Sequence, residues 1–82
     1  MKVSVIGTGY VGLVTGATLA DLGNQVVCLD ILKEKIDMLN TGKSPIFEPG
    51  LTELIQKGIK TKNLIGSIEI EQHVRESDIT FI

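Results

Sequence analysis

A glycine-rich stretch near the N-terminus constrains the fold of this 82-residue chain more than any other feature. Gly7, Gly9 and Gly12 follow directly on the apolar run 2–6, and apolar and small residues then continue from 11 to 22. The first run has the length and composition of a β-strand, and the second has those of a helix. The order of these segments predicts a strand, a tight turn and a helix in immediate succession.

Each glycine of this turn has a separate physical role. Gly7 permits the tight turn, Gly9 lets the backbone approach a bound pyrophosphate, and Gly12 lets the helix pack closely on the strand. The N–H groups at the start of the helix, from about Tyr10 and Val11, would point at the pyrophosphate and add the positive end of the helix dipole. The spacing therefore predicts a phosphate-binding loop, and the alternative is a glycine-rich turn with a structural role alone.

An acidic residue after the next apolar run indicates which dinucleotide the loop would bind. Asp30 lies 18 residues beyond Gly12 (30 − 12) and follows the predicted strand 25–29, as the ribose-binding acid does in Rossmann domains. A carboxylate there can accept hydrogen bonds from both ribose hydroxyls and would repel the 2′-phosphate of NADP. Ile31 and Leu32 come next and cannot hold a phosphate. We therefore expect NAD as the cofactor, although Asp30 could also serve as the N-cap of the next helix.

The rest of the chain alternates short apolar runs with helical patterns, which is typical of parallel strands joined by crossover helices. Right-handed crossovers predict an α/β fold with a Rossmann-type doubly wound parallel sheet, incomplete, of about four strands in the order 3-2-1-4. The elements expected after Asp30 are helices at 32–40, from Pro49 to Gly58 and at 69–76, and strands at 64–65 and 79–82.

Composition argues against several classes of protein. The net charge is −2 and the acidic and basic residues are mixed, so no basic block would bind nucleic acid. The uncharged run 3–20 is interrupted by glycines, so we expect neither a signal peptide nor a membrane span. The single cysteine cannot form an internal disulfide, and we expect a reducing, cytoplasmic location.

Two residues that often carry chemistry have simpler interpretations here. Cys28 lies in the middle of a predicted strand, where we expect a buried thiol with a raised pKa. His73 lies on a short polar helix, where we expect a solvated side chain. Because no nucleophile is paired with a base and no group of ligands has metal-binding spacing, we expect no catalytic residue and no metal site in the chain.

Longer stretches of the sequence are more specific than the glycine spacing. They read G-T-G-Y-V-G-L at 7–13, V-T-G-A-T-L-A at 14–20, V-V-C-L-D at 26–30 and L-N-T-G-K-S-P-I-F-E-P-G-L at 39–51. Almost the whole chain thus resembles the N-terminal end of the UDP-glucose and GDP-mannose 6-dehydrogenase family, with E-P-G-L as the discriminating part. Asn24 and Phe47 depart from the residues common in that family, and neither affects the cofactor assignment.

The resemblance implies NAD as cofactor and a two-step, four-electron oxidation of the sugar C6 alcohol to a carboxylate. It implies that the backbone at Tyr10 and Val11 contacts the pyrophosphate, and that Asp30 and Lys35 contact the adenosine ribose. It also implies that the catalytic cysteine, lysine, asparagine and aspartate of the family, and its sugar-nucleotide domain, lie beyond residue 82.

We therefore expect residues 1–82 to be a truncated N-terminal portion of an NAD-binding domain that has no catalytic activity by itself. For the full-length enzyme the resemblance implies a homodimer that oxidises UDP-glucose to UDP-glucuronate, with neither nucleic acid nor membrane as a partner. Two alternatives stay open: GDP-mannose as the substrate, and a stand-alone NAD-binding module or inactive fragment.

Overall fold

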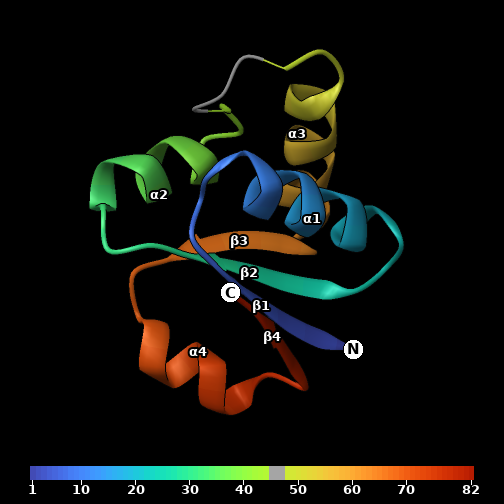
Figure 1. Cartoon of the computed structure of the whole chain (residues 1–82). Helices are drawn as coiled ribbons and strands as arrows, with labels where there is room; N and C mark the ends of the chain where they lie inside the picture. The colour runs from blue at the N-terminus through green and yellow to red at the C-terminus, as the bar shows by residue number, and fades with distance from the viewer. Residues whose placement is uncertain (45–47) are drawn as a thin grey trace.

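The computed structural model describes residues 1–44 and 48–82, which form a parallel sheet with helices on both faces (Figure 1). The sheet has four strands in the order β3-β2-β1-β4, which confirms the predicted α/β fold and strand order. The elements are β1 (Lys2–Ile6), α1 (Tyr10–Asp21), β2 (Gln25–Leu29), α2 (Lys33–Asn40), α3 (Leu51–Thr61), β3 (Leu64–Ser67), α4 (Ile70–Glu76) and β4 (Ile79–Phe81).

The register of the sheet decides which loops meet at its carboxyl edge. β1 is central and pairs in parallel with β2 on one side and with β4 on the other. Ile6, the last residue of β1, lies opposite Leu29, the last residue of β2. The loop that follows β1 and the residue that follows β2 therefore emerge side by side.

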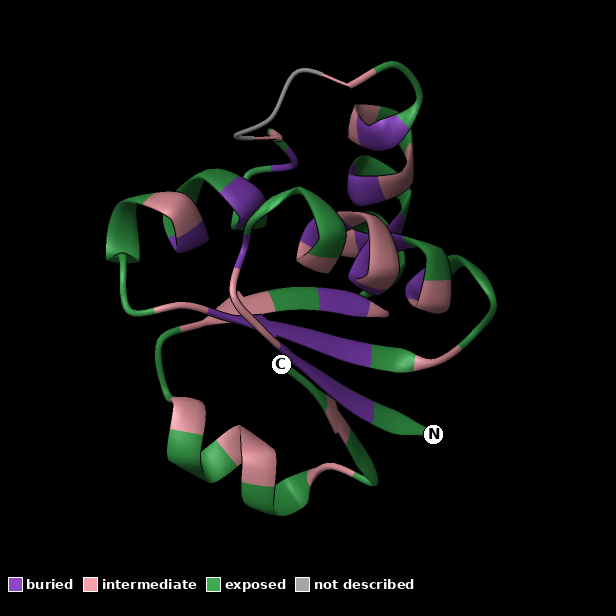
Figure 2. Cartoon of the chain, in the orientation of Figure 1, coloured by how far each residue is buried: buried purple, intermediate pink, exposed green. Residues whose placement is uncertain are grey.

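The hydrophobic core lies on one face of the sheet, beneath α1 and α3. Figure 1 shows α1, α2 and α3 on this face and α4 on the other. Figure 2 shows the buried positions gathered between the sheet and the three helices of the first face. α4 has no buried residue. The core residues are Val3, Val5, Leu13, Ala17, Ala20, Val26, Cys28, Leu39, Leu51, Ile55 and Leu64.

The third helix differs from its predicted bounds at both ends. It begins at Leu51, because Gly50 precedes it in the left-handed region with φ of 84°. We expected Pro49 to be the first helical residue, and this prediction was wrong. It also continues past Gly58 to Thr61. A Cβ on Gly58 would lie 2.7 Å from the Cβ of Leu64, so this glycine permits close packing of α3 on β3 and does not end the helix. Each of the other elements differs from its predicted bounds by no more than two residues.

Cys28 and His73 differ in how well the sequence predicted their surroundings. Cys28 is fully buried, and burial raises the pKa of its thiol to about 12, which confirms the core assignment. His73 is less exposed than we predicted, because its side chain is half-buried, with 23% exposed. It lines a cavity of about 270 Å³ with Val27 and Ile65, on the face of the sheet that α4 covers.

In the described ranges 1–44 and 48–82, no helix has the length and apolar character needed to span a membrane.

Candidate functional site

The loop between β1 and α1 makes the tight turn that the glycine spacing predicts. Gly7 adopts φ of 99°, a left-handed conformation that favours glycine because it has no Cβ. Its N–H donates a hydrogen bond of 2.7 Å to the carbonyl of Leu29. The loop is thereby attached to the end of β2 directly after leaving β1.

The first turn of α1 presents N–H groups without a capping side chain. Gly9 is the N-cap and supplies no side-chain hydrogen bond, and the first turn contains no acidic residue. The first N–H groups of any helix have no carbonyl partner within the helix, and here they include those of Tyr10 and Val11. These donors and the positive end of the helix dipole can together hold an anion.

Gly9 and Gly12 have contrasting surroundings. A Cβ on Gly12 would lie 2.4 Å from the carbonyl oxygen of Gly7, whereas a Cβ on Gly9 would meet nothing within 4 Å. Gly12 therefore permits α1 to approach the loop, as we expected from its spacing. Gly9 leaves open space above the backbone, which is the room that a closely approaching phosphate needs.

A cavity of about 430 Å³ adjoins this turn. Its walls include the loop glycines, Tyr10 and Val11, together with Thr15 of α1 and Phe81 of β4. It thus lies where β1 and β4 end and α1 begins. Ligands of open α/β sheets bind at this edge, outside the carboxyl ends of the strands.

Asp30 is held against the glycine loop by Thr8, a residue that the sequence analysis did not single out. The Oδ2 atom of Asp30 accepts a hydrogen bond of 2.6 Å from the Thr8 hydroxyl and one of 3.1 Å from the Thr8 N–H. The Oδ1 atom accepts a hydrogen bond of 3.0 Å from the N–H of Leu32. Leu32 is the N-cap of α2, so the alternative that Asp30 is itself the N-cap of this helix is wrong.

These contacts keep the carboxyl group of Asp30 ionised. Partial burial by itself would raise its pKa, but the hydrogen bonds from the Thr8 hydroxyl and from the N–H groups of Leu32 and Thr8 outweigh this effect. The positive charge of Lys35 acts in the same direction, and the pKa of Asp30 lies below its usual value. The structure therefore holds Asp30 against the glycine loop through Thr8, and Lys35 of α2 acts on its carboxylate through its charge.

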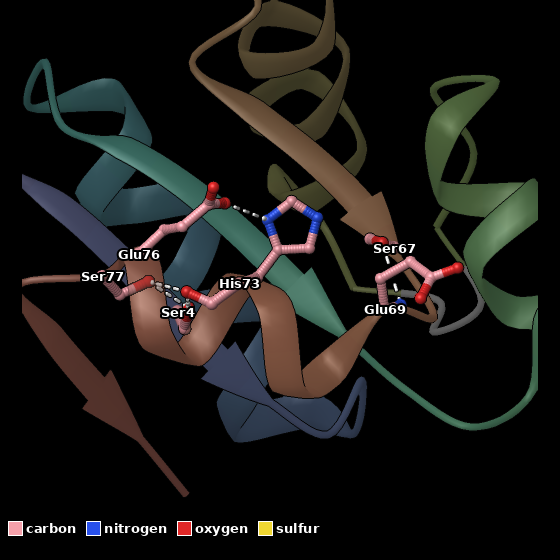
Figure 3. Close-up of polar contacts among 6 residues, drawn as sticks. All are labelled: Ser4, Ser67, Glu69, His73, Glu76 and Ser77. Carbon is pink, nitrogen blue, oxygen red and sulfur yellow. Dashed lines mark hydrogen bonds and ion pairs between the residues drawn. The ribbon is translucent and has the colours of Figure 1, made fainter.

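A second polar cluster, on the opposite face of the sheet, ties α4 to β1 (Figure 3). Ser4 is fully buried, and its hydroxyl contacts that of Ser77 and donates to the carbonyl of His73. The Ser77 hydroxyl donates to the same carbonyl at 2.7 Å, and Nδ1 of His73 lies 3.9 Å from Glu76. These contacts join the C-terminal end of α4 to the centre of β1. No group of three or more metal-ligating side chains occurs in the part of the chain that the structure describes.

A parallel sheet of order 3-2-1-4, a glycine turn after β1 and an acid after β2 define a Rossmann-type dinucleotide-binding domain. Residues 1–82 match the NAD-binding domain of the UDP-glucose/GDP-mannose dehydrogenase family. The chain belongs to this family, and NAD is the cofactor of the domain.

Relatives with two different names are equally similar in sequence. The chain is 48% identical over 82 residues to a GDP-mannose 6-dehydrogenase of Pseudomonas syringae, covering 100% of the chain and 19% of that protein. It is 48% identical over 81 residues to the UDP-glucose 6-dehydrogenase TuaD of Bacillus subtilis, covering 99% of the chain and 18% of that protein. The chain thus spans about a fifth of the length of these relatives.

The solved structures show the same fold. The GDP-mannose dehydrogenase of Pseudomonas aeruginosa, determined as a ternary complex, superposes with a TM-score of 0.97 at 44% sequence identity. The superposition covers 100% of this chain and 19% of that one. The arrangement of strands and helices described above is therefore that of the family.

Proposed function

We propose that the loop after β1 binds the pyrophosphate of NAD and that the acid after β2 binds its adenosine ribose. The observation that carries the proposal is the contact between Asp30 and the loop: the Oδ2 atom of Asp30 accepts two hydrogen bonds, both from Thr8 of the loop. The open space above Gly9, in the wall of the cavity, fits a phosphate group. The residues proposed to bind the cofactor are Gly7, Gly9, Tyr10, Val11, Gly12, Asp30 and Lys35.

Electrostatics supports NAD as the preferred form of the cofactor. With its pKa below the usual value, Asp30 is ionised at neutral pH and would repel a 2′-phosphate. A ribose hydroxyl, in contrast, would donate a hydrogen bond to the same carboxylate, and the negative charge of the carboxylate would strengthen that bond. The positive charge of Lys35 makes the smallest contribution to lowering the pKa of Asp30, after the hydrogen bonds from Thr8 and Leu32.

For the intact protein that carries this chain, we propose an NAD-dependent nucleotide-sugar 6-dehydrogenase. NAD would accept the electrons from the C6 alcohol, and the residues described above would hold and orient it. We take UDP-glucose as the first substrate to test and GDP-mannose as the alternative, because relatives at 48% identity carry both names. Formation of NADH by the intact protein with only one of the two sugars would decide between them. That the enzyme is a cytoplasmic homodimer stays a prediction from the sequence.

Titration of the intact protein with NAD and with NADP tests the cofactor site. We expect NAD to bind at least about tenfold more tightly, equivalent to about 1.4 kcal/mol. Asp30→Ala should weaken NAD binding and narrow this difference. Glu34→Ala is the matched control, because Glu34 is an exposed acid in the first turn of α2. Equal affinities of the wild-type protein for NAD and NADP would refute the proposal.

A further inference from the structure

Thr8 is buried although it belongs to a loop that we propose to bind cofactor. Its exposed fraction is 2%, and both of its hydrogen-bond donors, the hydroxyl and the backbone N–H, are directed to the same oxygen of Asp30. Neither group is therefore available to a phosphate. Position 8 is also the variable residue between the first two glycines of the motif, where a general fingerprint assigns no role.

The hydrogen bonds to Asp30 limit how its carboxylate can meet a ligand. A carboxylate offers about four acceptor positions, two on each oxygen. Thr8 fills both positions on Oδ2 and the N–H of Leu32 fills one on Oδ1. One position on Oδ1 is left, so this geometry allows one strong ribose hydrogen bond and not the two that the sequence pattern suggests.

We propose that Thr8 is a positioning residue that sets the selectivity for NAD over NADP by fixing the carboxylate of Asp30. The inference rests on the proposed function and adds a residue to it. To make room for a 2′-phosphate, Asp30 would have to turn away from the loop. That movement would leave the buried hydroxyl and N–H of Thr8 without acceptors, which is costly. Thr8 thus opposes the adjustment by which the site could accept NADP.

The hydroxyl of Thr8 also lowers the pKa of Asp30, so its removal has a second consequence. Without that hydrogen bond, the pKa of Asp30 rises towards its usual value of 3.8. NAD binding that depends on the ionised carboxylate would then be lost at a higher pH than in the wild type. A purely structural role of Thr8 would not produce this shift.

The test replaces Thr8 in the intact protein and measures the dissociation constants of NAD and NADP as a function of pH. Thr8→Val removes the hydroxyl at nearly constant shape, and we expect the NAD preference to fall by about tenfold, or about 1.4 kcal/mol. Thr8→Ser keeps the hydroxyl and should retain the wild-type preference. Thr18→Val is the matched control on the exposed part of α1. If the valine variant does not fold, Thr8→Ala removes the same group.

A double-mutant cycle with Asp30→Ala shows whether Thr8 acts through Asp30. In the Asp30→Ala variant, we expect Thr8→Val to leave the ratio of the NAD and NADP dissociation constants unchanged. If Thr8→Val weakens the binding of NAD and NADP equally, so that the ratio of their dissociation constants and the pH profile stay unchanged, only the proposed role of Thr8 is overturned. An equal effect of Thr8→Val with and without Asp30 would overturn it too. A wild-type protein that binds neither cofactor would overturn the proposed function itself.

Discussion

Replacing Gly12 with alanine tests the approach of α1 to the phosphate loop. The new Cβ would lie 2.4 Å from the carbonyl oxygen of Gly7, whereas ordinary contacts begin at 3.4 Å. That oxygen is a backbone atom, so no flexible side chain can move aside to relieve the clash. The N–H of the same residue, Gly7, is hydrogen-bonded to the carbonyl of Leu29, which holds the turn in place. The start of α1 must therefore retreat by about 1 Å (3.4 − 2.4).

The magnitude follows from two opposing effects. Overpacking costs about 1–3 kcal/mol, and alanine in place of glycine within a helix returns at most about 1 kcal/mol. Because the clash is with backbone, we take the upper end of the cost and expect a net loss of about 2 kcal/mol in the free energy of unfolding. The retreat also moves the N–H groups of Tyr10 and Val11, so NAD affinity should fall.

Gly9→Ala is the matched comparison, because a Cβ at position 9 meets no atom within 4 Å and its φ of −73° suits alanine. We expect it to lower stability by no more than about 1 kcal/mol, as an N-cap substitution does, while its methyl group blocks the approach of the pyrophosphate. Urea unfolding and NAD titration of both variants in the intact protein separate the two roles. The reasoning is refuted if Gly12→Ala unfolds at the wild-type urea concentration, or if Gly9→Ala is the less stable of the two.

Two further predictions concern titrating groups. Because burial raises the pKa of the Cys28 thiol to about 12, alkylation should be very slow in the folded protein near neutral pH and fast in denaturant. The neutral thiol stabilises the fold below its ordinary pKa of 9.0, and this contribution is lost as the pH rises towards 12; rapid alkylation of the folded protein would contradict the assignment. Because the pKa of Asp30 is lowered in the folded protein, its ionised carboxylate stabilises the fold fully at pH values above its ordinary pKa of 3.8. This stabilisation is lost as the pH falls through the lower pKa that Asp30 has in the folded protein. Wild type and Asp30→Asn should therefore differ in urea midpoint near neutral pH and converge in acid, and a difference that persists in strong acid would count against this interpretation.

The sequence by itself determined the class of fold and the place of the glycine turn between β1 and α1. The strand, the glycine turn and the helix that follows are local patterns, whose periods of two and 3.6 residues can be read over a few neighbouring positions. The order of the strands followed from the handedness of crossover connections, which holds for parallel sheets in general. Asp30 could be predicted as the ribose-binding acid because its place after the second strand, 18 residues beyond Gly12 (30 − 12), is a property of the fold; this role stays a prediction.

Only the tertiary structure decided which side chains meet across the sheet. Thr8 and Asp30 are 22 residues apart, and Ser4 and Ser77 are 73 apart. No local period links such positions, so the sequence could not show that a hydroxyl holds the carboxylate of Asp30 or that α4 is joined to β1 by hydrogen bonds. Gly58 was misread for the same reason, since a glycine in a helical pattern has the same local signature whether it ends the helix or, as here, admits Leu64 of a neighbouring strand.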